Sequence, residues 1–266
     1  MRLRIDLAYD GTDFRGWAVQ PGLRTVQGEL QDALATVLRI ESAAVVCAGR
    51  TDAGVHARAQ VVHVDLDDPP APEWLLRRLN GILPADVRVR RVVAAPEGFD
   101  ARFGALWRRY AYRIADDAAY VDPLMRAQVL AWPRPLDERA MNAAALLLVG
   151  RHDFASFCKQ REGATTIRTL LELSWTRDET GLLVGTVVAD AFCHSMVRAL
   201  VGCLISIGEG RQPVDWADDV LRAELRNPGV VVVHAHGLTL EEVAYPADDE
   251  LTARAVVTRA KRESDD

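Results

Sequence analysis

The stretch CAGRTDAGVHA, from Cys47 to Ala57, places a carboxylate, a guanidinium and two glycines directly after the apolar run AAVV. A carboxylate in such a turn can act as a nucleophile or a base if it is held in place and kept ionised. Asp52 is therefore a candidate catalytic residue. Arg50 would point to the same side as Asp52 if strand geometry continued through the turn. The structural alternative is an ordinary Asx turn in which Gly54 supplies the positive φ.

A lone arginine marks the most apolar segment of the chain. The run CHSMVRALVGCLISIG, residues 193–208, predicts a buried helix in which Arg198 is the only formal charge. Arginine is seldom buried unless an anion meets it, because an unpaired buried charge costs several kcal/mol. Arg198 therefore either pairs with a buried carboxylate, for which Asp52 is the best candidate, or reaches solvent or backbone carbonyls.

A third group of chemically useful side chains lies on the predicted strand LWRRYAYRI, residues 106–114. Strand alternation places Leu106, Arg108, Tyr110, Tyr112 and Ile114 on one face and Trp107, Arg109, Ala111 and Arg113 on the other. Basic and aromatic side chains together on a sheet suit stacked bases and phosphates. The alternative is an aromatic core with its arginines in water.

The first half of the chain contains the elements that would position Asp52. Strands are predicted over 3–9, 43–48, 59–66 and 87–93, with a helix capped by Thr25 and a second helix over 73–80. This order, β-α-β-β-α-β, is that of a split βαβ or ferredoxin-like unit. The segment 94–104 is the predicted junction with the second half.

The second half repeats the pattern with larger insertions. Strands are predicted over 106–114, 167–175, 182–189 and 237–245, and helices over 138–149, 193–207 and 216–225. The predicted fold class is α+β, with two ferredoxin-like halves whose mixed, mainly antiparallel sheets are joined across a central cleft. The predicted boundaries are 1–104 for the half with Asp52, 105–246 for the half with the buried helix, and 247–266 for an acidic tail.

Composition restricts the class of protein. With 266 residues, of which 49% are apolar, the chain is typical of a globular protein with one large or two modest domains. The four cysteines show no framework spacing, which predicts reduced thiols, and the six histidines show no spacing typical of metal ligands. No signal peptide or membrane-spanning run is present, so we expect a cytoplasmic protein.

The net charge of −6 disfavours a polyanionic partner on average, but the charge is unevenly distributed. Residues 101–115 contain Arg102, Arg108, Arg109 and Arg113 without an acid, whereas the C-terminal tail is acidic. If RNA binds, these arginines must gather in one cleft while the acids face away from it.

Five segments together resemble the tRNA pseudouridine synthase A family. They are YDGTDFRGWAVQPGLRTVQGEL, CAGRTDAGVHA, FDARFGALWRRYAYRI, GRHDFASFC and AFCHSMVRALVGCLISIGEGR, in the family's order, and the resemblance runs from about Leu3 to Pro246. It implies isomerisation of uridine to pseudouridine at positions 38 to 40 of the tRNA anticodon stem-loop, with no cofactor and no metal. It also implies tRNA and a second copy of the chain as partners, and neither DNA nor a membrane.

The resemblance assigns roles to individual residues. Asp52 matches the catalytic carboxylate, which either attacks C1′ or removes a proton from C2′; the sequence does not choose between these roles. Arg50 matches the arginine that either helps to flip the target base or holds its place, Tyr110 matches the tyrosine against the uracil ring, and Arg198 matches the partner of Asp52. The expected RNA contacts, besides Tyr110, are Arg15, Arg24, Arg58, Arg102, Arg108 and Arg109.

The chain departs from the family pattern at two places. Ser195 stands where a second histidine is common, and VVVVHAHGL, residues 230–238, replaces a proline-rich approach to the last strand. Two other functions would use part of this pattern. A non-catalytic RNA-binding protein would use the same basic strand without needing Asp52. An aspartate-dependent glycosidase would need a second carboxylate near Asp52, and the motif offers none.

Overall fold

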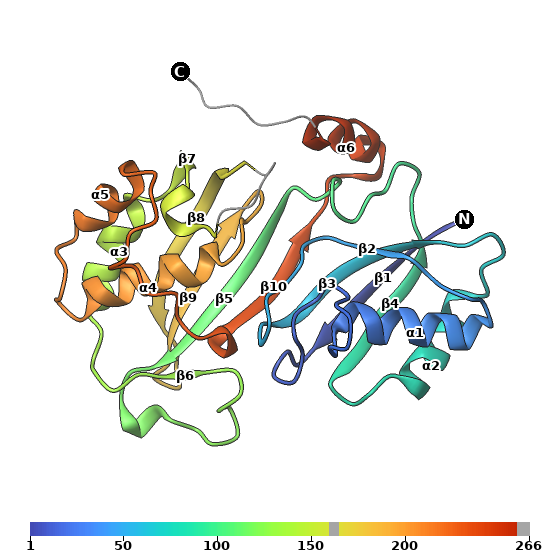
Figure 1. The fold of residues 1–266 in the computed structure, drawn as a ribbon, viewed down its shortest axis with the longest axis horizontal. Helices are drawn as coiled ribbons and strands as arrows, with labels where there is room; N and C mark the ends of the chain where they lie inside the picture. Colours follow the sequence, from blue (N-terminus) through green and yellow to red (C-terminus); the bar gives the residue numbers. More distant parts are fainter. Residues whose placement is uncertain (160–164, 260–266) are drawn as a thin grey trace. The chain divides into compact units, whose positions relative to one another are not determined.

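The computed structural model describes residues 1–159 and 165–259, and in it the chain divides into two compact units. Unit 1 contains Met1–Leu106 together with the described chain from Leu240 onward, and unit 2 contains Trp107–Thr239. Figure 1 shows strands covered by helices in each unit. Residues 260–266, the end of the predicted acidic tail, lie outside the described residues.

Unit 1 is built on the predicted order β-α-β-β-α-β. Its elements are β1 (Arg2–Tyr9), α1 (Val26–Leu38), β2 (Val45–Cys47), β3 (His56–Asp65), α2 (Pro72–Ile82) and β4 (Val87–Ala94). Strand β1 lies between β4 and β3 and is antiparallel to both, and β2 pairs with β3 in the same sense. Helices α1 and α2 contact each other on one face of these strands (Figure 1).

Local sequence explains these elements. Leu3, Ile5, Leu7 and Tyr9 of β1 are buried while their neighbours are half-buried, as the alternation predicts. Helix α1 begins after Thr25, whose side-chain oxygen accepts a hydrogen bond from the Gly28 N–H at 3.3 Å.

Unit 2 has a larger set of elements. These are β5 (Trp107–Ala115), β6 (Leu130–Ala131), α3 (Glu138–Leu146), β7 (Gly150–Asp153), β8 (Ile167–Arg177), β9 (Leu183–Ala189), α4 (Met196–Gly208) and α5 (Trp216–Arg222). The antiparallel order is β5-β9-β8-β7, and β6 adds a short parallel pairing to β5. Three short 3-10 helices, Ala118–Tyr120, Ala155–Phe157 and Ala235–Gly237, lie in the connections.

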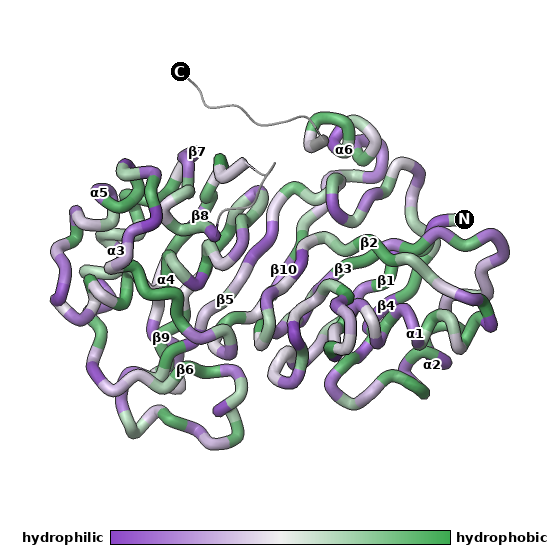
Figure 2. The backbone as a smooth tube through the Cα atoms, viewed as in Figure 1, coloured by the Kyte–Doolittle hydropathy of each residue, from purple (hydrophilic) through white to green (hydrophobic). Residues whose placement is uncertain are grey.

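The predicted buried helix is confirmed as α4. Every residue of α4 except Arg198 is buried, and Figure 2 shows the segment mainly in the hydrophobic colour. The helix begins at Met196 and not at Cys193, because Ser195 adopts a left-handed conformation with φ of 63° that interrupts the helical path.

The α+β class with mainly antiparallel pairing is confirmed. The last strand, β10 (Leu238–Ala244), pairs with β3, and unit 1 includes it from Leu240, whereas the predicted C-terminal half was 105–246. The chain then forms a 3-10 turn (Asp248–Glu250) and helix α6 (Leu251–Arg259). Leu251 is buried, and Arg254 donates to the Ala105 carbonyl at 3.2 Å, so this part of the predicted tail packs on unit 1.

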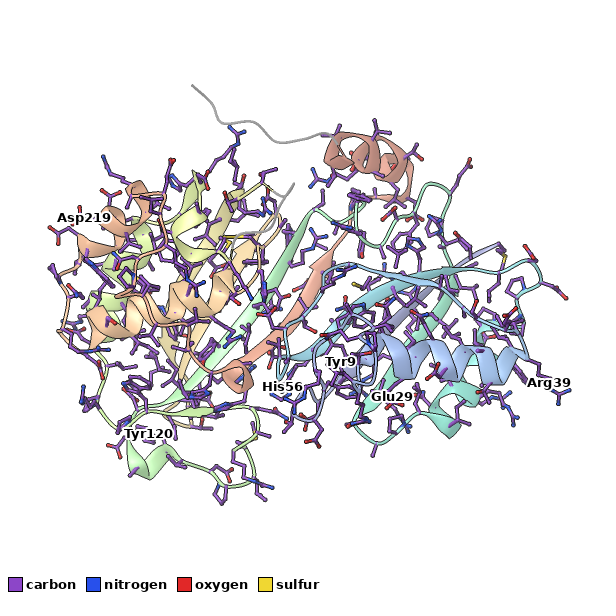
Figure 3. All side chains as sticks on the ribbon, in the orientation of Figure 1. Tyr9, Glu29, Arg39, His56, Tyr120 and Asp219 are labelled. Carbon is purple, nitrogen blue, oxygen red and sulfur yellow. A yellow bond between two sulfur atoms is a disulfide. The ribbon has the colours of Figure 1, made fainter. Side chains whose placement is uncertain are left out.

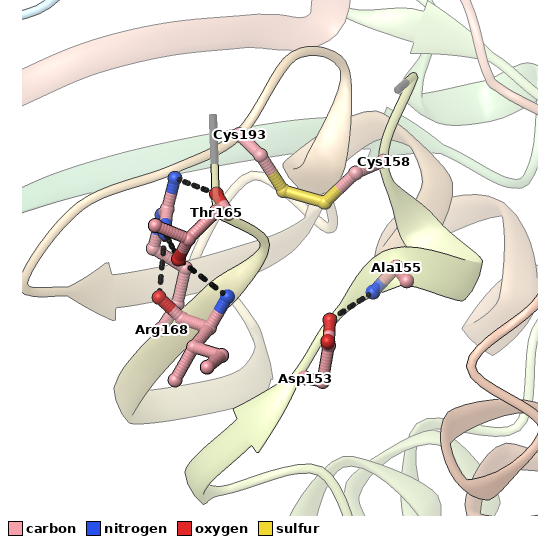
Figure 4. Close-up of a disulfide and its surroundings, with 7 residues drawn as sticks. Asp153, Ala155, Cys158, Thr165, Arg168 and Cys193 are labelled. Atoms are coloured by element: carbon pink, nitrogen blue, oxygen red, sulfur yellow. Dashed lines mark hydrogen bonds between the residues drawn. A yellow bond between two sulfur atoms is a disulfide. The ribbon is translucent and has the colours of Figure 1, made fainter. Parts of the chain in front are cut away.

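The prediction of reduced thiols is wrong for two cysteines. Cys158 and Cys193 form a disulfide with their Cα atoms 5.7 Å apart (Figure 4). They are 35 positions apart in sequence and meet because the segment after the 3-10 helix 155–157 lies beside the approach to α4, where the Lys159 N–H donates to the His194 carbonyl at 3.0 Å. Cys47 and Cys203 are buried and form no disulfide, and burial raises the pKa of the Cys203 thiol to about 12.

In the described part of the chain, no helix combines the length and apolar character needed to cross a membrane.

Candidate active site

Asp52 lies in the loop between β2 and β3 of unit 1. Strand β2 ends at Cys47 and the chain bends at Ala48 and Gly49, so strand alternation does not extend to Arg50. Asp52 is half-buried and Arg50 is exposed. The relative direction of these two side chains is therefore set by the loop and not by a strand.

The segment that follows β1 holds this loop by backbone hydrogen bonds. The Trp17 N–H donates to the Thr51 carbonyl at 3.0 Å, and the Gly54 N–H donates to the Phe14 carbonyl at 3.3 Å. Within the loop, the Val55 N–H donates to the Asp52 carbonyl at 3.2 Å. The backbone on both sides of Asp52 is therefore fixed to a second segment of the same unit.

Two glycines in the sequence DGTDFRG allow this close approach. A Cβ on Gly11 would lie 2.0 Å from the Val55 carbonyl oxygen, which no side chain could tolerate. Gly16 has a φ of +96°, and a Cβ there would lie 3.0 Å from the Thr51 carbonyl oxygen. These glycines are explained by packing against the Asp52 loop.

A histidine links the same two segments. His56, at the start of β3, is buried, and its Nδ1 accepts a hydrogen bond from the Gly11 N–H at 3.0 Å. Asp10 Oδ1 also lies 3.0 Å from this nitrogen. Burial opposes the charge of Asp10, but hydrogen bonds from Thr12 and the proximity of His56 outweigh it, so the pKa of Asp10 lies below its usual value. Figure 3 labels His56 and Tyr9 in this region.

Sequence reasoning missed the polar side chains beneath the loop. Gln60 on β3 is fully buried, and its Nε2 donates to the Gly49 carbonyl at 2.8 Å. Tyr9 on β1 lies with its hydroxyl 2.8 Å from Thr51 Oγ1. One signal was available: an amide in the otherwise apolar run AQVV needs a buried partner.

In unit 2, β5 presents Tyr110 and Tyr112 on its buried face. Tyr110 is 7% exposed and meets the Phe192 ring edge to face with centroids 5.1 Å apart. Tyr112 donates its hydroxyl proton to the His234 carbonyl at 2.7 Å, and burial raises its pKa far above its usual value. The Tyr112 hydroxyl therefore has a structural role, as the donor of this hydrogen bond to His234.

Arg198 is half-buried in unit 2, near the start of α4. Its Nε donates to the Val233 carbonyl at 2.7 Å, and its own carbonyl accepts from the Val233 N–H at 3.3 Å. A contact with a backbone carbonyl was one of the two alternatives that the sequence left open. The pairing with Asp52 stays a prediction.

The predicted RNA-binding arginines differ in their surroundings. Arg24 makes ion pairs with Glu29 at 2.8 Å and Asp86 at 2.7 Å, and its pKa is raised chiefly by the hydrogen bond to Asp86. Arg58 lies 3.3 Å from Glu241. The positive charges of Arg24 and Arg58 are therefore each paired with carboxylates of unit 1.

The other four arginines divide by exposure. Arg108 is 6% exposed and donates to the Asp190 carbonyl at 2.6 Å, which favours a structural task. Arg109 is half-buried, Arg15 is exposed, and Arg102 is exposed with its guanidinium over the Phe103 ring at 5.0 Å. Among the residues described, no cluster of three or more His, Cys, Asp or Glu side chains could hold a metal ion.

Known proteins of a single family are similar to this chain over nearly its whole length. A family profile described as tRNA pseudouridine synthase matches residues 7–104 and 144–246. The chain is 60% identical over 267 residues to tRNA pseudouridine synthase A of Streptomyces griseus, covering 98% of this chain and 94% of that protein. Proteins of the same name from Frankia casuarinae and Mycobacterium leprae are 60% and 49% identical, covering 98% and 99% of this chain and 96% of each relative. The chain therefore belongs to the tRNA pseudouridine synthase family.

Proposed function

We propose that this enzyme isomerises uridine to pseudouridine at positions 38 to 40 in the anticodon stem-loop of tRNA. Membership of the family supports tRNA uridine as the substrate. The choice of positions 38 to 40 rests on the resemblance of the Asp52 loop and the α4 segment to the family that acts there. A homodimer and a cytoplasmic location, which that resemblance also implies, are part of the proposal.

The reaction needs only groups that this chain can supply. The N1–C1′ bond breaks, the uracil turns, a C5–C1′ bond forms, C5 loses its proton and N1 gains one, so that no electrons enter or leave. The Asp52 carboxylate either attacks C1′ or removes the C2′ proton to start this sequence. In either case it must be ionised and correctly placed, because a displacement of about 1 Å can cost on the order of 10²-fold in rate.

The observation that carries the proposal is the fixed backbone around Asp52. Thr51 and Gly54, on either side of it, are bonded to Trp17 and Phe14, and Gly11 and Gly16 permit the contact. An ordinary Asx turn on the surface would not require a second segment with two obligatory glycines. The loop instead has the rigidity expected of a loop that carries a reacting carboxylate.

The remaining roles in the proposal are those that the resemblance to the family implies. Arg50 is exposed and can occupy the space that a flipped base leaves in the RNA helix, which lowers the unstacking cost of a few kcal/mol. In the proposal, Tyr110 packs against the uracil ring and Arg198 pairs with Asp52. Arg15, which is exposed, is better suited to phosphate than Arg24 and Arg58, which already have carboxylate partners.

The proposal is tested by mapping pseudouridine in three tRNA transcripts that each carry a single uridine, at position 38, 39 or 40, in the anticodon arm. We expect pseudouridine at these positions and none in a matched transcript with cytidine at all three. Modification confined to another part of the tRNA would refute the positions, and no pseudouridine in any tRNA would refute the activity.

A further inference from the structure

The polar side chains beneath the Asp52 loop have no task in the reaction just described. Gln60 lies on β3, a strand whose other inward residues near it are valines, and it is 0% exposed. A hydrocarbon side chain would fill this position without the desolvation cost of an amide. The amide must therefore serve something other than core packing.

Every polar group of Gln60 has a partner near the loop. Its Nε2 donates to the Gly49 carbonyl at 2.8 Å and to the Tyr9 hydroxyl at 3.3 Å, and its Oε1 accepts from the Val61 N–H at 3.2 Å. The Tyr9 hydroxyl in turn lies 2.8 Å from Thr51 Oγ1. One buried amide is thus linked to the residues immediately before and after Arg50.

An irregularity in strand β3 turns the Gln60 side chain toward the loop. In the pairing of β1 with β3, Leu7 faces Gln60 but Tyr9 faces Ala57, so β3 contains an extra residue in between. Such a bulge re-aims the side chains next to it. The Tyr9 ring, 5% exposed, also packs near the Trp17 ring with centroids 6.1 Å apart, and Trp17 holds the Thr51 carbonyl.

We propose that Gln60, acting through Gly49 and through the Tyr9–Thr51 hydrogen bond, is a positioning residue that fixes the backbone of the loop that carries Asp52. This inference rests on the proposed function for the role of Asp52. Gln60 holds the chain two residues before Thr51, and Tyr9 holds the side chain of the residue directly preceding Asp52. Strand β2 ends at Cys47, and the Ala48 N–H still donates to the Val61 carbonyl at 2.8 Å. The side-chain bonds to Gly49 and Thr51 hold the chain beyond that point.

The first test is Gln60→Met, which keeps the length of the side chain but removes its hydrogen bonds. We expect the single-turnover rate of tritium release from C5-labelled tRNA to fall about 10- to 100-fold while the Kd for tRNA changes less than about threefold. Asn80→Leu is the matched control: Asn80 bridges to both the N–H and the carbonyl of Val89 at 2.9 Å, in the same unit but away from the loop. It should lose stability without a slower chemical step.

The second test uses the Tyr9–Thr51 bond. Tyr9→Phe and Thr51→Val each remove that bond and keep the shape of the side chain, so the double variant should be no slower than the slower single variant. Additive losses would show that the two residues act separately. A Gln60→Met enzyme with the wild-type rate, or one slowed only as much as Asn80→Leu at equal stability, would overturn the inference.

A third measurement needs no activity. Hydrogen exchange of the free protein should show faster exchange of the amides of residues 50–54 in Gln60→Met, with the amides of α2 and β4 unchanged. If the wild-type protein releases no tritium from any tRNA, the proposed function fails, and the exchange result still decides whether Gln60 orders the loop. Unchanged exchange in residues 50–54 would refute the inference even in an active enzyme.

Discussion

The two units present their candidate site residues in different ways. In unit 2, Tyr110 lies on β5, whose register with β9 is continuous, and Arg198 lies in the first turn of a helix that is otherwise buried. In unit 1, Asp52 lies on a loop that begins after a strand of three residues. Unit 2 therefore positions its side chains with regular backbone hydrogen bonds, whereas unit 1 needs backbone and side-chain bonds from three separate segments.

This difference indicates which positions tolerate substitution and which do not. A strand or helix tolerates exchanges of similar apolar residues, because its backbone bonds do not depend on side chains. The Asp52 loop depends on Gly11, Gly16, Tyr9 and Gln60, each of which has a conformation or a hydrogen bond that few residues could reproduce. Substitutions should thus affect unit 2 mainly through stability and unit 1 mainly through the rate.

Arg198 is the exception in unit 2, and its replacement should have the largest effect there. Arg198→Ala removes the bond to the Val233 carbonyl, which should lower the free energy of unfolding by about 1 to 3 kcal/mol. If Arg198 also pairs with Asp52, tritium release should fall about 10- to 100-fold or more, and Arg198→Lys, which keeps the charge, should recover part of the rate but not the stability.

Arg222→Ala is the control for this comparison, because Arg222 is an exposed arginine of the same unit whose pair with Asp218 is in water. It should behave as wild type in denaturant unfolding and in the tritium assay. An Arg198→Ala protein with wild-type turnover and stability would contradict both tasks assigned to Arg198.

A smaller effect concerns the pH dependence of unit 1. Burial, with help from nearby Arg2, lowers the pKa of His63, against the opposing influence of Asp100 and Asp65. The neutral ring accepts a hydrogen bond from the Ala101 N–H at 3.0 Å. Because the folded-state pKa lies below the unfolded value of about 6.5, this contribution to stability is complete above pH 6.5 and is lost as the pH falls through the folded-state pKa.

We therefore expect His63→Asn, which does not titrate, to lose less stability than wild type between pH 7.5 and 5. The difference is measured by denaturant unfolding at each pH. Identical pH profiles for His63→Asn and wild type would show that His63 does not contribute to the pH dependence of stability.

Sequence patterns predicted the regular elements of both units because strand and helix periodicity depends on local burial. The alternation of β1, the Thr25 cap and the apolar run of α4 all correspond to observed elements. The disulfide was not predictable, since Cys158 and Cys193 come together only through tertiary packing. Nor was the burial of Arg108, because alternation identifies a face of a strand but not which face the core covers.

Asp52 itself was predicted from its motif, but the network that holds it was not. Gln60 and Tyr9 are 51 positions apart in sequence and lie on the paired strands β3 and β1. Only the register of these strands, including its bulge, brings both residues close to Thr51. Sequence spacing contains no information on that register. The identity of a reacting group is thus a local property of the chain, whereas its support is a property of the fold.

The catalytic role of Asp52 is tested by tritium release from tRNA labelled at uridine C5, with wild type, Asp52→Asn and Asp68→Asn compared under single-turnover conditions. Asp68 is an exposed carboxylate of the same unit and serves as the control for lost charge. We expect wild type and Asp68→Asn to release tritium at the same rate, and Asp52→Asn to bind tRNA but to be slower by on the order of 10³-fold or more. Release by Asp52→Asn at the wild-type rate would contradict this role.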